Sequence, residues 1–152
     1  MARLPSSVLF ACGYNSIRSP MAAVFLRALH GRRIFVDSVG VRAAPLDPFA
    51  VTVMAELGLD LGHQHPKTFA ALEDTSFDLV VSLTPEAQHK AVELTRTMAC
   101  EVEFWPVFDP TAVEGSREER LAAYRLTRDH IRRRVLERFP LVPPVQSDAA
   151  GS

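Results

Sequence analysis

Cysteine is scarce in this chain, which has 152 residues and only two cysteines. A disulfide scaffold is therefore excluded, and the fold must depend on a hydrophobic core, for which 47% hydrophobic residues suffice. Long apolar runs are missing too. The first run, residues 8–11, is shorter than the roughly 7–15 apolar residues of a signal peptide, and none approaches the roughly 18 of a membrane-spanning helix. We therefore expect a cytoplasmic protein without membrane partners, in a compartment that keeps thiols reduced.

An excess of either charge is also missing. Seventeen basic and eighteen acidic side chains leave a net charge of −1, so no overall field favours nucleic acid or an anionic membrane as a partner. Histidine, cysteine and aspartate do not cluster with the spacing of metal ligands, apart from the weak pair His63 and His65. The sequence therefore predicts no metal and no cofactor, and any recognition of an anion must be local.

Internal repeats are absent as well, and the length suits one compact domain, which we expect at residues 1–139. Residues 140–152 begin with three prolines in five positions and continue with small and polar side chains. This composition predicts a disordered tail, because it offers too little apolar surface to pack.

Four short apolar runs are present, rich in valine, isoleucine, leucine and phenylalanine. Each predicts a strand buried on both faces, and the capped or amphipathic segments between them predict helices. The expected strands are residues 8–11, 34–36, 77–81 and 102–105; the expected helices are residues 20–30 with Ser19 as cap, 48–58 with Asp47 as cap, 85–98, and 117–139 with Ser116 as cap. This alternation predicts an α/β fold in three layers, with a mostly parallel sheet between helices.

Cys12 follows the first expected strand. Arg18 comes six positions later, just before the first expected helix. Five intervening residues allow the backbone to curl around one tetrahedral anion, with its N–H groups pointing inward. The positive field of Arg18 favours the nucleophilic thiolate form of Cys12, and its guanidinium can hold two oxygens. Asn15 suits a left-handed backbone position, and Ser19 can hydrogen-bond the thiolate. The expected phosphate-binding residues are Gly13, Tyr14, Asn15, Ser16, Ile17 and Ser19.

Two Asp-Pro pairs could supply the proton that a departing ester oxygen needs. Asp47 precedes an expected helix and is explained as its cap. Asp109 follows the fourth expected strand, with no helix expected before Ser116. It therefore lies at the carboxyl edge of the sheet, where α/β folds bind ligands. Asp109 is the expected general acid.

The chain resembles the low molecular weight protein tyrosine phosphatases in the motif residues Cys12, Asn15, Arg18-Ser-Pro and a late Asp109-Pro. The resemblance implies a four-stranded parallel sheet in the order 2-1-3-4, the fold of phosphotyrosine protein phosphatase I. It also implies Cys12 as nucleophile, Arg18 as phosphate clamp, and Asp109 as general acid and then base. Ser38 looks like the family serine that supports the loop asparagine.

The resemblance covers about residues 7–139 and includes departures. Tyr14 stands where the family has glycine, and it can stack on a substrate ring, narrow the mouth of the loop or simply face outward. Ile17 stands where many members have a second cysteine, so their protective disulfide cannot form here. The supporting histidine of the family aligns with a stretch in which either His63 or Gln64 could take its place.

The resemblance implies a cysteine-dependent phosphatase that hydrolyses phosphate monoesters through a phosphocysteine intermediate, with protein phosphotyrosine as the expected substrate. Its partners would be a phosphorylated protein or a small phosphate ester, and inorganic phosphate would be the product. The tyrosine pair that commonly follows the acid of the family is absent from residues 111–115, which makes other phosphate esters reasonable substrates.

Two other functions stay open. Residues 115–129 look more like the arsenate reductases that share this fold. Those enzymes use two further cysteines after the third strand, but residues 80–88 contain none, and Cys100 is expected to be a small buried hydrophobe. Arsenate reduction would therefore need an external thiol such as glutathione or mycothiol. A non-catalytic phosphoprotein binder is the third hypothesis, because Tyr14 in place of glycine could distort the loop.

Overall fold

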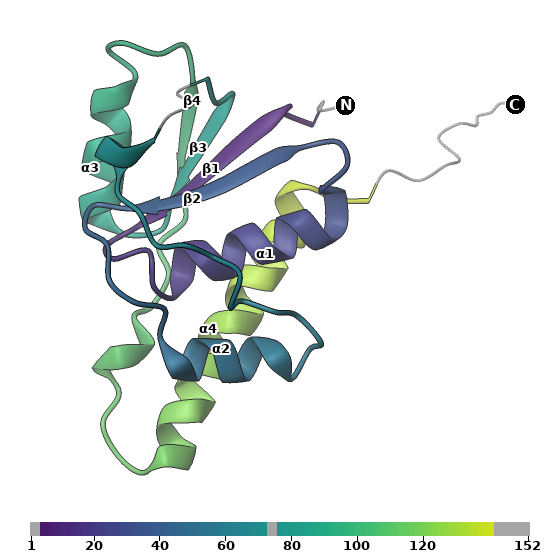
Figure 1. The fold of residues 1–152 in the computed structure, drawn as a ribbon, viewed down its shortest axis with the longest axis vertical. Helices are drawn as coiled ribbons and strands as arrows, with labels where there is room; N and C mark the ends of the chain where they lie inside the picture. Colours follow the sequence, from purple (N-terminus) through teal and green to yellow (C-terminus); the bar gives the residue numbers. More distant parts are fainter. Residues whose placement is uncertain (1–3, 73–75, 142–152) are drawn as a thin grey trace, which may run out of the picture.

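The computed structural model describes residues 4–72 and 76–141 of the chain. Its centre is a sheet of four parallel strands in the order β2-β1-β3-β4 (Figure 1). The strands are β1 (Ser7–Cys12), β2 (Phe35–Gly40), β3 (Leu79–Ser82) and β4 (Glu101–Phe104). The predicted α/β class and the implied strand order are confirmed.

Helices cover both faces of the sheet. The helices are α1 (Arg18–His30), α2 (Pro48–Ala55), α3 (Pro85–Leu94) and α4 (Arg117–Arg138), and two short 3-10 helices are η1 (Phe69–Ala71) and η2 (Pro110–Ala112). Figure 1 shows α3 on one face and α1 on the other, with α4 beside α1 and α2 packed on α4. The three predicted layers are therefore present.

Alternating side chains of β1 connect the sheet to both helical layers. Val8 and Phe10 belong to the larger core cluster, together with buried side chains of α1 and α4. Leu9 and Ala11 point the other way, into a smaller cluster with two buried alanines of α3. Because every residue of β1 is buried, the strand is packed on both faces. Its last residue, Cys12, consequently has a well-defined position at the carboxyl edge of the sheet.

Two strands differ from the expectation. β2 does not end near residues 34–36 but continues to Gly40, because it pairs with β1 along its whole length. Asp37 and Ser38 therefore lie within the strand and not after it. The prediction that the fourth strand is buried on both faces is wrong. β4 is an edge strand that pairs only with β3, and its side chains are exposed or half-buried.

Two helix caps are confirmed, and two helices end earlier than predicted. Asp47 accepts hydrogen bonds from two backbone amides of α2, and Ser116 forms a capping box with Glu119 at the start of α4. α2 ends at Ala55 and α3 at Leu94, several residues before the predicted ends, because turns take over the last part of each segment.

The ends of the chain are described only in part. The tail predicted at residues 140–152 lies, from residue 142 onward, outside the described residues. The division into one domain at residues 1–139 stays a prediction. Of the helices that the structure describes, none has both the length and the apolar character required to cross a membrane.

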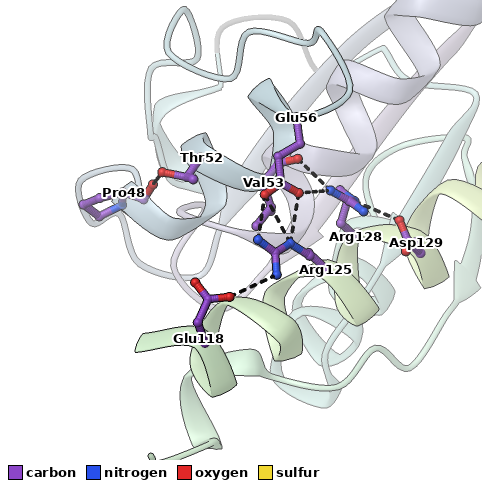
Figure 2. Close-up of polar contacts among 8 residues, drawn as sticks. All are labelled: Pro48, Thr52, Val53, Glu56, Glu118, Arg125, Arg128 and Asp129. Atoms are coloured by element: carbon purple, nitrogen blue, oxygen red, sulfur yellow. Dashed lines mark hydrogen bonds and ion pairs between the residues drawn. The ribbon is translucent and has the colours of Figure 1, made fainter. Parts of the chain in front are cut away.

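α2 is held against α4 at both of its ends. At the C-terminal end, Arg125 donates to both carboxylate oxygens of Glu56 at 2.9–3.1 Å, and Arg128 donates to the same group at 2.8 Å. Figure 2 shows both guanidinium groups pointing at this one carboxylate. At the N-terminal end, the Tyr124 hydroxyl donates to Asp47 Oδ2 at 2.7 Å. α4 therefore holds the start of α2 in place, next to the carboxyl edge of the sheet.

Candidate active site

The loop of residues 13–17 joins β1 to α1 and closes back on Cys12. The Cys12 side chain is buried, at 2% exposure. Its Sγ lies 3.0 Å from Ser19 Oγ and 3.5 Å from the backbone nitrogen of Ser19, which donates to it. Asn15 has the left-handed backbone that its short polar side chain predicts, with φ 56°. The thiol thus lies at the N-terminus of α1, where the helix dipole and free N–H groups favour an anion.

Asn15 fastens this loop to the rest of the molecule. It is 1% exposed. Its Nδ2 donates to Ser19 Oγ at 2.8 Å and to Ser38 Oγ at 3.0 Å. Its Oδ1 accepts from the backbone N–H of Lys67 at 2.9 Å. Ser38 therefore makes the contact that the resemblance implied for it.

The backbone of Lys67 supplies the contact for which His63 and Gln64 were the two candidates. His63 is instead 86% exposed and pairs with Asp60 at the surface. The backbone of Gln64 closes a local turn with Leu61. Sequence reasoning missed Lys67 because any residue except proline can donate a backbone N–H, so the side chain gives no signal.

Ser19 is not the helix cap that the sequence predicts. α1 begins one residue earlier, at Arg18, and Ile17 occupies the cap position without a side-chain hydrogen bond. The Ser19 hydroxyl is already used: it accepts from Asn15 and can donate either to Cys12 or, at 3.2 Å, to Val39 O. The Ser19 hydroxyl has one proton, so it can turn from Val39 O and donate its hydrogen bond to the sulfur when the sulfur is a thiolate.

Arg18 reaches from the start of α1 to the segment that follows β4. Its Nη1 donates to Val107 O at 3.0 Å. A guanidinium has five N–H donors in one plane, so this bond leaves other donors for a ligand. The contact also ties the Cys12 loop to the segment that carries Asp109.

Asp109 uses one of its two carboxylate oxygens to start a short helix. Its Oδ1 accepts from the backbone N–H of Thr111 at 2.9 Å and from the Thr111 hydroxyl at 2.7 Å. The expectation of no helix before Ser116 is wrong, because Asp109 caps η2 and Pro110 suits its first position. Within the described residues Oδ2 accepts no hydrogen bond, so it can carry a proton toward a ligand.

These groups face one pocket at the carboxyl edge of the sheet, with a volume of about 310 Å³. The pocket is lined by Cys12, Tyr14, Ser16, Ile17, Arg18, Ala44, Asp47, Asp109 and Thr111. The structure thus brings together the three residues predicted to be catalytic. The other predicted loop residues, Gly13, Asn15 and Ser19, are buried and complete the loop behind the pocket wall.

Asp47 is a pocket residue that sequence reasoning explained only as a helix cap. Its backbone N–H donates to Ser16 O at 3.1 Å, which joins the start of α2 to the Cys12 loop. Its Oδ2 accepts from the Tyr124 hydroxyl, and burial together with this contact raises the pKa of Tyr124. The Asp-Pro pair was a visible signal, but only the tertiary contacts show that it reaches the pocket.

The pocket combines one cation with two carboxylates. Arg18 is the cation, and Asp47 and Asp109 are the carboxylates. In the parts of the chain that the structure describes, no three histidine, cysteine, aspartate or glutamate side chains gather in a way that could hold a metal ion. Arg18 and the loop amides can bind an oxyanion.

Comparison with known proteins agrees with this geometry. Residues 7–138 match the model of the family described as low molecular weight phosphotyrosine protein phosphatase. The chain belongs to this family. An arsenate reductase of Bacillus subtilis (strain 168) is 32% identical over 130 residues, which are 86% of this chain and 92% of that protein.

Solved structures give the same result. An arsenate reductase in the phosphate binding state has a TM-score of 0.66 at 27% identity, and the match covers 86% of this chain and 94% of that one. A low molecular weight protein tyrosine phosphatase from T. tengcongensis has a TM-score of 0.71 at 24% identity, covering 85% and 94%. These structures agree in fold, and the family match identifies the chain as an enzyme to which both the phosphatase interpretation and the arsenate reductase alternative apply.

Tyr14, like Ile17, departs from the family pattern and lines the pocket. Its side chain is 52% exposed and lies at the rim of the pocket. The Arg42 guanidinium lies 5.8 Å from the centre of its ring, and Arg42 also pairs with Glu86 at the start of α3. Tyr14 thus has a partner on one side and remains open to solvent, which suits contact with a bound substrate.

The second cysteine lies at the opposite edge of the sheet from the first. Cys100 directly precedes β4, and β4 starts beside the N-terminal half of β3. Cys12 ends β1, so the length of the sheet separates the two thiols. Burial raises the pKa of Cys100, which keeps it protonated. Its side chain packs against the smaller core cluster, as the prediction of a small hydrophobe requires, but it is half-buried and not buried as predicted.

Gly40 is a site residue that sequence reasoning did not single out. It ends β2 directly beneath the Cys12 loop. A Cβ at this position would lie 2.6 Å from Asn15 N and 2.7 Å from the Tyr14 carbonyl carbon. Only glycine permits this close approach of two backbones. The sequence feature that could have identified Gly40 is its place two residues after Ser38, shortly after the second expected strand.

Proposed function

We propose that this enzyme is a phosphatase that hydrolyses phosphate monoesters, above all phosphotyrosine in proteins, through a phosphocysteine intermediate. The observation that carries the proposal is that Cys12, Arg18 and Asp109 line one pocket. They supply a nucleophile, an oxyanion clamp and a proton donor, which together are sufficient for displacement at phosphorus.

The first step transfers the phosphoryl group to the protein. The Cys12 thiolate attacks phosphorus, an S–P bond forms and the ester P–O bond breaks. Arg18 and the inward N–H groups of the loop hold the other phosphate oxygens. Asp109 gives its proton to the departing oxygen, so that the leaving group departs as a neutral phenol or alcohol and Asp109 becomes a carboxylate.

The second step releases phosphate. The Asp109 carboxylate takes a proton from water, the water oxygen bonds to phosphorus and the S–P bond breaks. The electron pair of that bond returns to Cys12 as a thiolate. Ser19 lies 3.0 Å from this sulfur and can donate its hydroxyl proton to it, which stabilises the leaving thiolate. Inorganic phosphate is the product, and Asp109 is again protonated.

A phosphorylated protein is the substrate that we favour. The pocket is small, and its rim carries the half-exposed Tyr14 with Arg42 over its ring. An aromatic ring of the substrate could stack against Tyr14, while the rest of the protein substrate stays outside. A cytoplasmic location is part of this proposal, since the thiol of Cys12 must stay reduced to act.

The test is hydrolysis of an aryl phosphate and of a phosphotyrosine peptide at mildly acidic pH. Cys12→Ser should abolish turnover of both. The Asp109→Asn variant should accumulate a phosphorylated Cys12 with a fast-leaving aryl phosphate, and mass spectrometry of the quenched protein would detect it. Absence of turnover in the parent protein, with retained binding of phosphopeptide, would instead support the non-catalytic binder.

Arsenate reduction is the second candidate function, and the arsenate reductase of Bacillus subtilis among the relatives supports it. Cys12 would attack arsenate, so that an S–As bond forms while an As–O bond breaks and its oxygen leaves as water. An external thiol such as glutathione or mycothiol would then attack the Cys12 sulfur, giving a mixed disulfide and arsenite. The external thiol is required because Cys100 lies at the other edge of the sheet.

One comparison separates the two functions. Turnover of an aryl phosphate is measured beside arsenate-dependent oxidation of each added thiol, with the same protein preparation and with Cys12→Ser as control. Phosphatase turnover without thiol oxidation supports the proposal. Thiol oxidation without phosphatase turnover would overturn it in favour of arsenate reduction.

A further inference from the structure

We propose that the ion pair between Lys67 and Asp37 positions the phosphate-binding loop, acting through the backbone of Lys67 on Asn15. The pair does not touch the pocket, so both members are positioning residues and not catalytic ones. The inference rests on the proposed function only in that an oxyanion binds at the Cys12 loop. It assigns a role to two charged side chains that the mechanism does not use.

The pair is close and partly buried. Lys67 Nζ lies 2.6 Å from Asp37 Oδ1, and the two side chains are 31% and 21% exposed. It lies in the wall of a second cavity behind the loop, where Asp60, His63 and His65 are the other charged or titratable neighbours together with Arg27. Partial burial makes such a pair stronger than one at the open surface.

Lys67 is the point where three contacts meet. Its backbone N–H donates to Asn15 Oδ1 at 2.9 Å, and its carbonyl accepts from Gly40 N–H at 2.9 Å. Its side chain is held by Asp37. Asp37 and Gly40 both belong to β2, so the strand holds Lys67 by its backbone and by its side chain at once.

The segment around Lys67 has little regular structure of its own. In the described chain no helix or strand covers residues 59–67, and the next residue, Thr68, forms an isolated bridge with Gly40. Backbone in such a segment opens more easily than backbone in a strand. A side-chain tether at Lys67 therefore contributes to keeping its N–H in place.

The position of that N–H matters for Cys12. Asn15 is held in a left-handed conformation, φ 56°, which few residue types adopt without support. Through Ser19, Asn15 is two hydrogen bonds away from the Cys12 sulfur. Loss of the tether should let Asn15 move, which widens the anion-binding loop and weakens the hydrogen bonding of Ser19 to the thiolate.

The experiment measures the loop without requiring turnover. Iodoacetate should modify Cys12 as its thiolate, and bound inorganic phosphate should protect it. Mass spectrometry of the Cys12 peptide separates this modification from modification of Cys100. Lys67→Met should weaken protection by phosphate about 3- to 10-fold, the effect of losing about one partly buried ion pair. It should also shift the pH profile of modification upward.

Matched variants show whether the charge pair is responsible. Lys67→Arg keeps the pair and should behave like the parent protein, whereas Asp37→Asn should resemble Lys67→Met. The double variant should be no worse than either single one, because the two changes remove the same interaction. Lys90→Met removes the only other lysine of the chain, which pairs with Glu93 on α3, and should change neither phosphate protection nor the pH profile.

The outcomes separate this inference from the proposed function. If Lys67→Met lowers the melting temperature but leaves phosphate protection within two-fold and the pH profile unchanged, the pair is only structural and the inference is overturned. If the parent protein shows no phosphatase turnover but phosphate protects Cys12, and Lys67→Met weakens that protection, the function fails and the inference stands. If phosphate does not protect Cys12 of the parent protein, the pH profile of modification decides. An upward shift in Lys67→Met then supports the inference, and an unchanged profile overturns it.

Discussion

Two aspartates, each followed by proline, line the same pocket, and their hydrogen bonds distinguish them. Both oxygens of Asp47 are occupied, Oδ1 by two backbone amides of α2 and Oδ2 by the hydroxyl of Tyr124. Asp109 accepts from Thr111 through Oδ1 only. A group that gives and takes a proton needs an oxygen free of other donors. This count of bonds favours Asp109 as the acid.

Replacing each aspartate by asparagine tests that choice. Asp109→Asn should lower kcat by about 10²–10⁴ on alkyl phosphates, whose leaving group needs a proton, and less on an aryl phosphate with a good leaving group. Asp47→Asn keeps an oxygen for the cap and should cost much less. Steady-state rates on both substrates check this, and a larger loss in Asp47→Asn would reverse the assignment.

Gly40 is the residue for which added volume should be most damaging. A Cβ there meets the backbone of Asn15 and Tyr14 at under 3 Å, and backbone cannot move aside without deforming the loop. We expect Gly40→Ala to destabilise the protein by about 1–3 kcal/mol and to lower kcat/KM. Gly13→Ala is the stability control, because a Cβ at Gly13 would meet no heavy atom within 4 Å beyond Gly13 and its two chain neighbours. Equal melting temperatures for the two variants would contradict the argument.

Among the elements, α2 depends on α4 for its position. Hydrogen bonds from Arg125, and then from Arg128, lower the pKa of Glu56 from its ordinary value of 4.5 (Figure 2). Because the pKa is lower in the folded state, the network stabilises the protein above about pH 4.5, and this stability is lost as the pH falls through the lowered pKa. The contact between the two helices should therefore weaken in acid.

Glu56→Gln should reproduce that acid effect at neutral pH. We expect a lower melting temperature than the parent protein at pH 7 and a smaller difference in acid, once the pH has fallen below the lowered pKa of the parent carboxylate. Glu93→Gln, in an exposed pair on α3, should change little at either pH. A difference between Glu56→Gln and the parent that is the same at both pH values would show that the charge of Glu56 is not responsible.

The start of α4 depends on a local capping box. Ser116 accepts from the Glu119 backbone N–H, and Glu119 accepts from the Ser116 backbone N–H, which also lowers the pKa of Glu119. Ser116→Ala should cost about 1 kcal/mol, or about 2–4 °C in melting temperature for a protein of this size. Ser116→Asp keeps an acceptor and should restore most of it. Calorimetry of the three proteins is the test, and no loss in Ser116→Ala would contradict it.

At the scale of the whole molecule, the sheet determines whether the two cysteines can form a disulfide. Cys12 and Cys100 lie at opposite edges, and Ile17 stands at the position where many members of the family have a second cysteine. A disulfide requires the two Cα atoms to lie within about 7 Å. The folded chain therefore has no partner for an oxidised Cys12.

Oxidation with hydrogen peroxide should accordingly give sulfenic and then sulfinic acid at Cys12, without an internal disulfide. Activity should return with a thiol after brief exposure only. Peptide mapping under non-reducing conditions measures the products, with Cys100→Ala as control. A peptide that links Cys12 to Cys100 would contradict the arrangement of the sheet.

The local pattern of the sequence predicts much of the fold. Strand and helix order, the caps at Asp47 and Ser116, and the positive φ of Asn15 follow from residue type and spacing, because each depends on neighbours within a few positions. The errors arise where longer contacts compete. Ser19 hydrogen-bonds Asn15 and Cys12 instead of capping α1, and β4 lies at an edge of the sheet with its side chains exposed or half-buried.

By itself, the sequence determined the chemistry at the end of β1: a cysteine, an arginine six positions later and a helix that starts beside that arginine. These features are set within about eight residues of chain. Only the tertiary structure decided that Asp109 reaches the pocket, that Asp47 lines it, and that a lysine backbone holds the loop asparagine. These contacts join residues that are tens of positions apart, and their register depends on how the whole sheet and its helices pack.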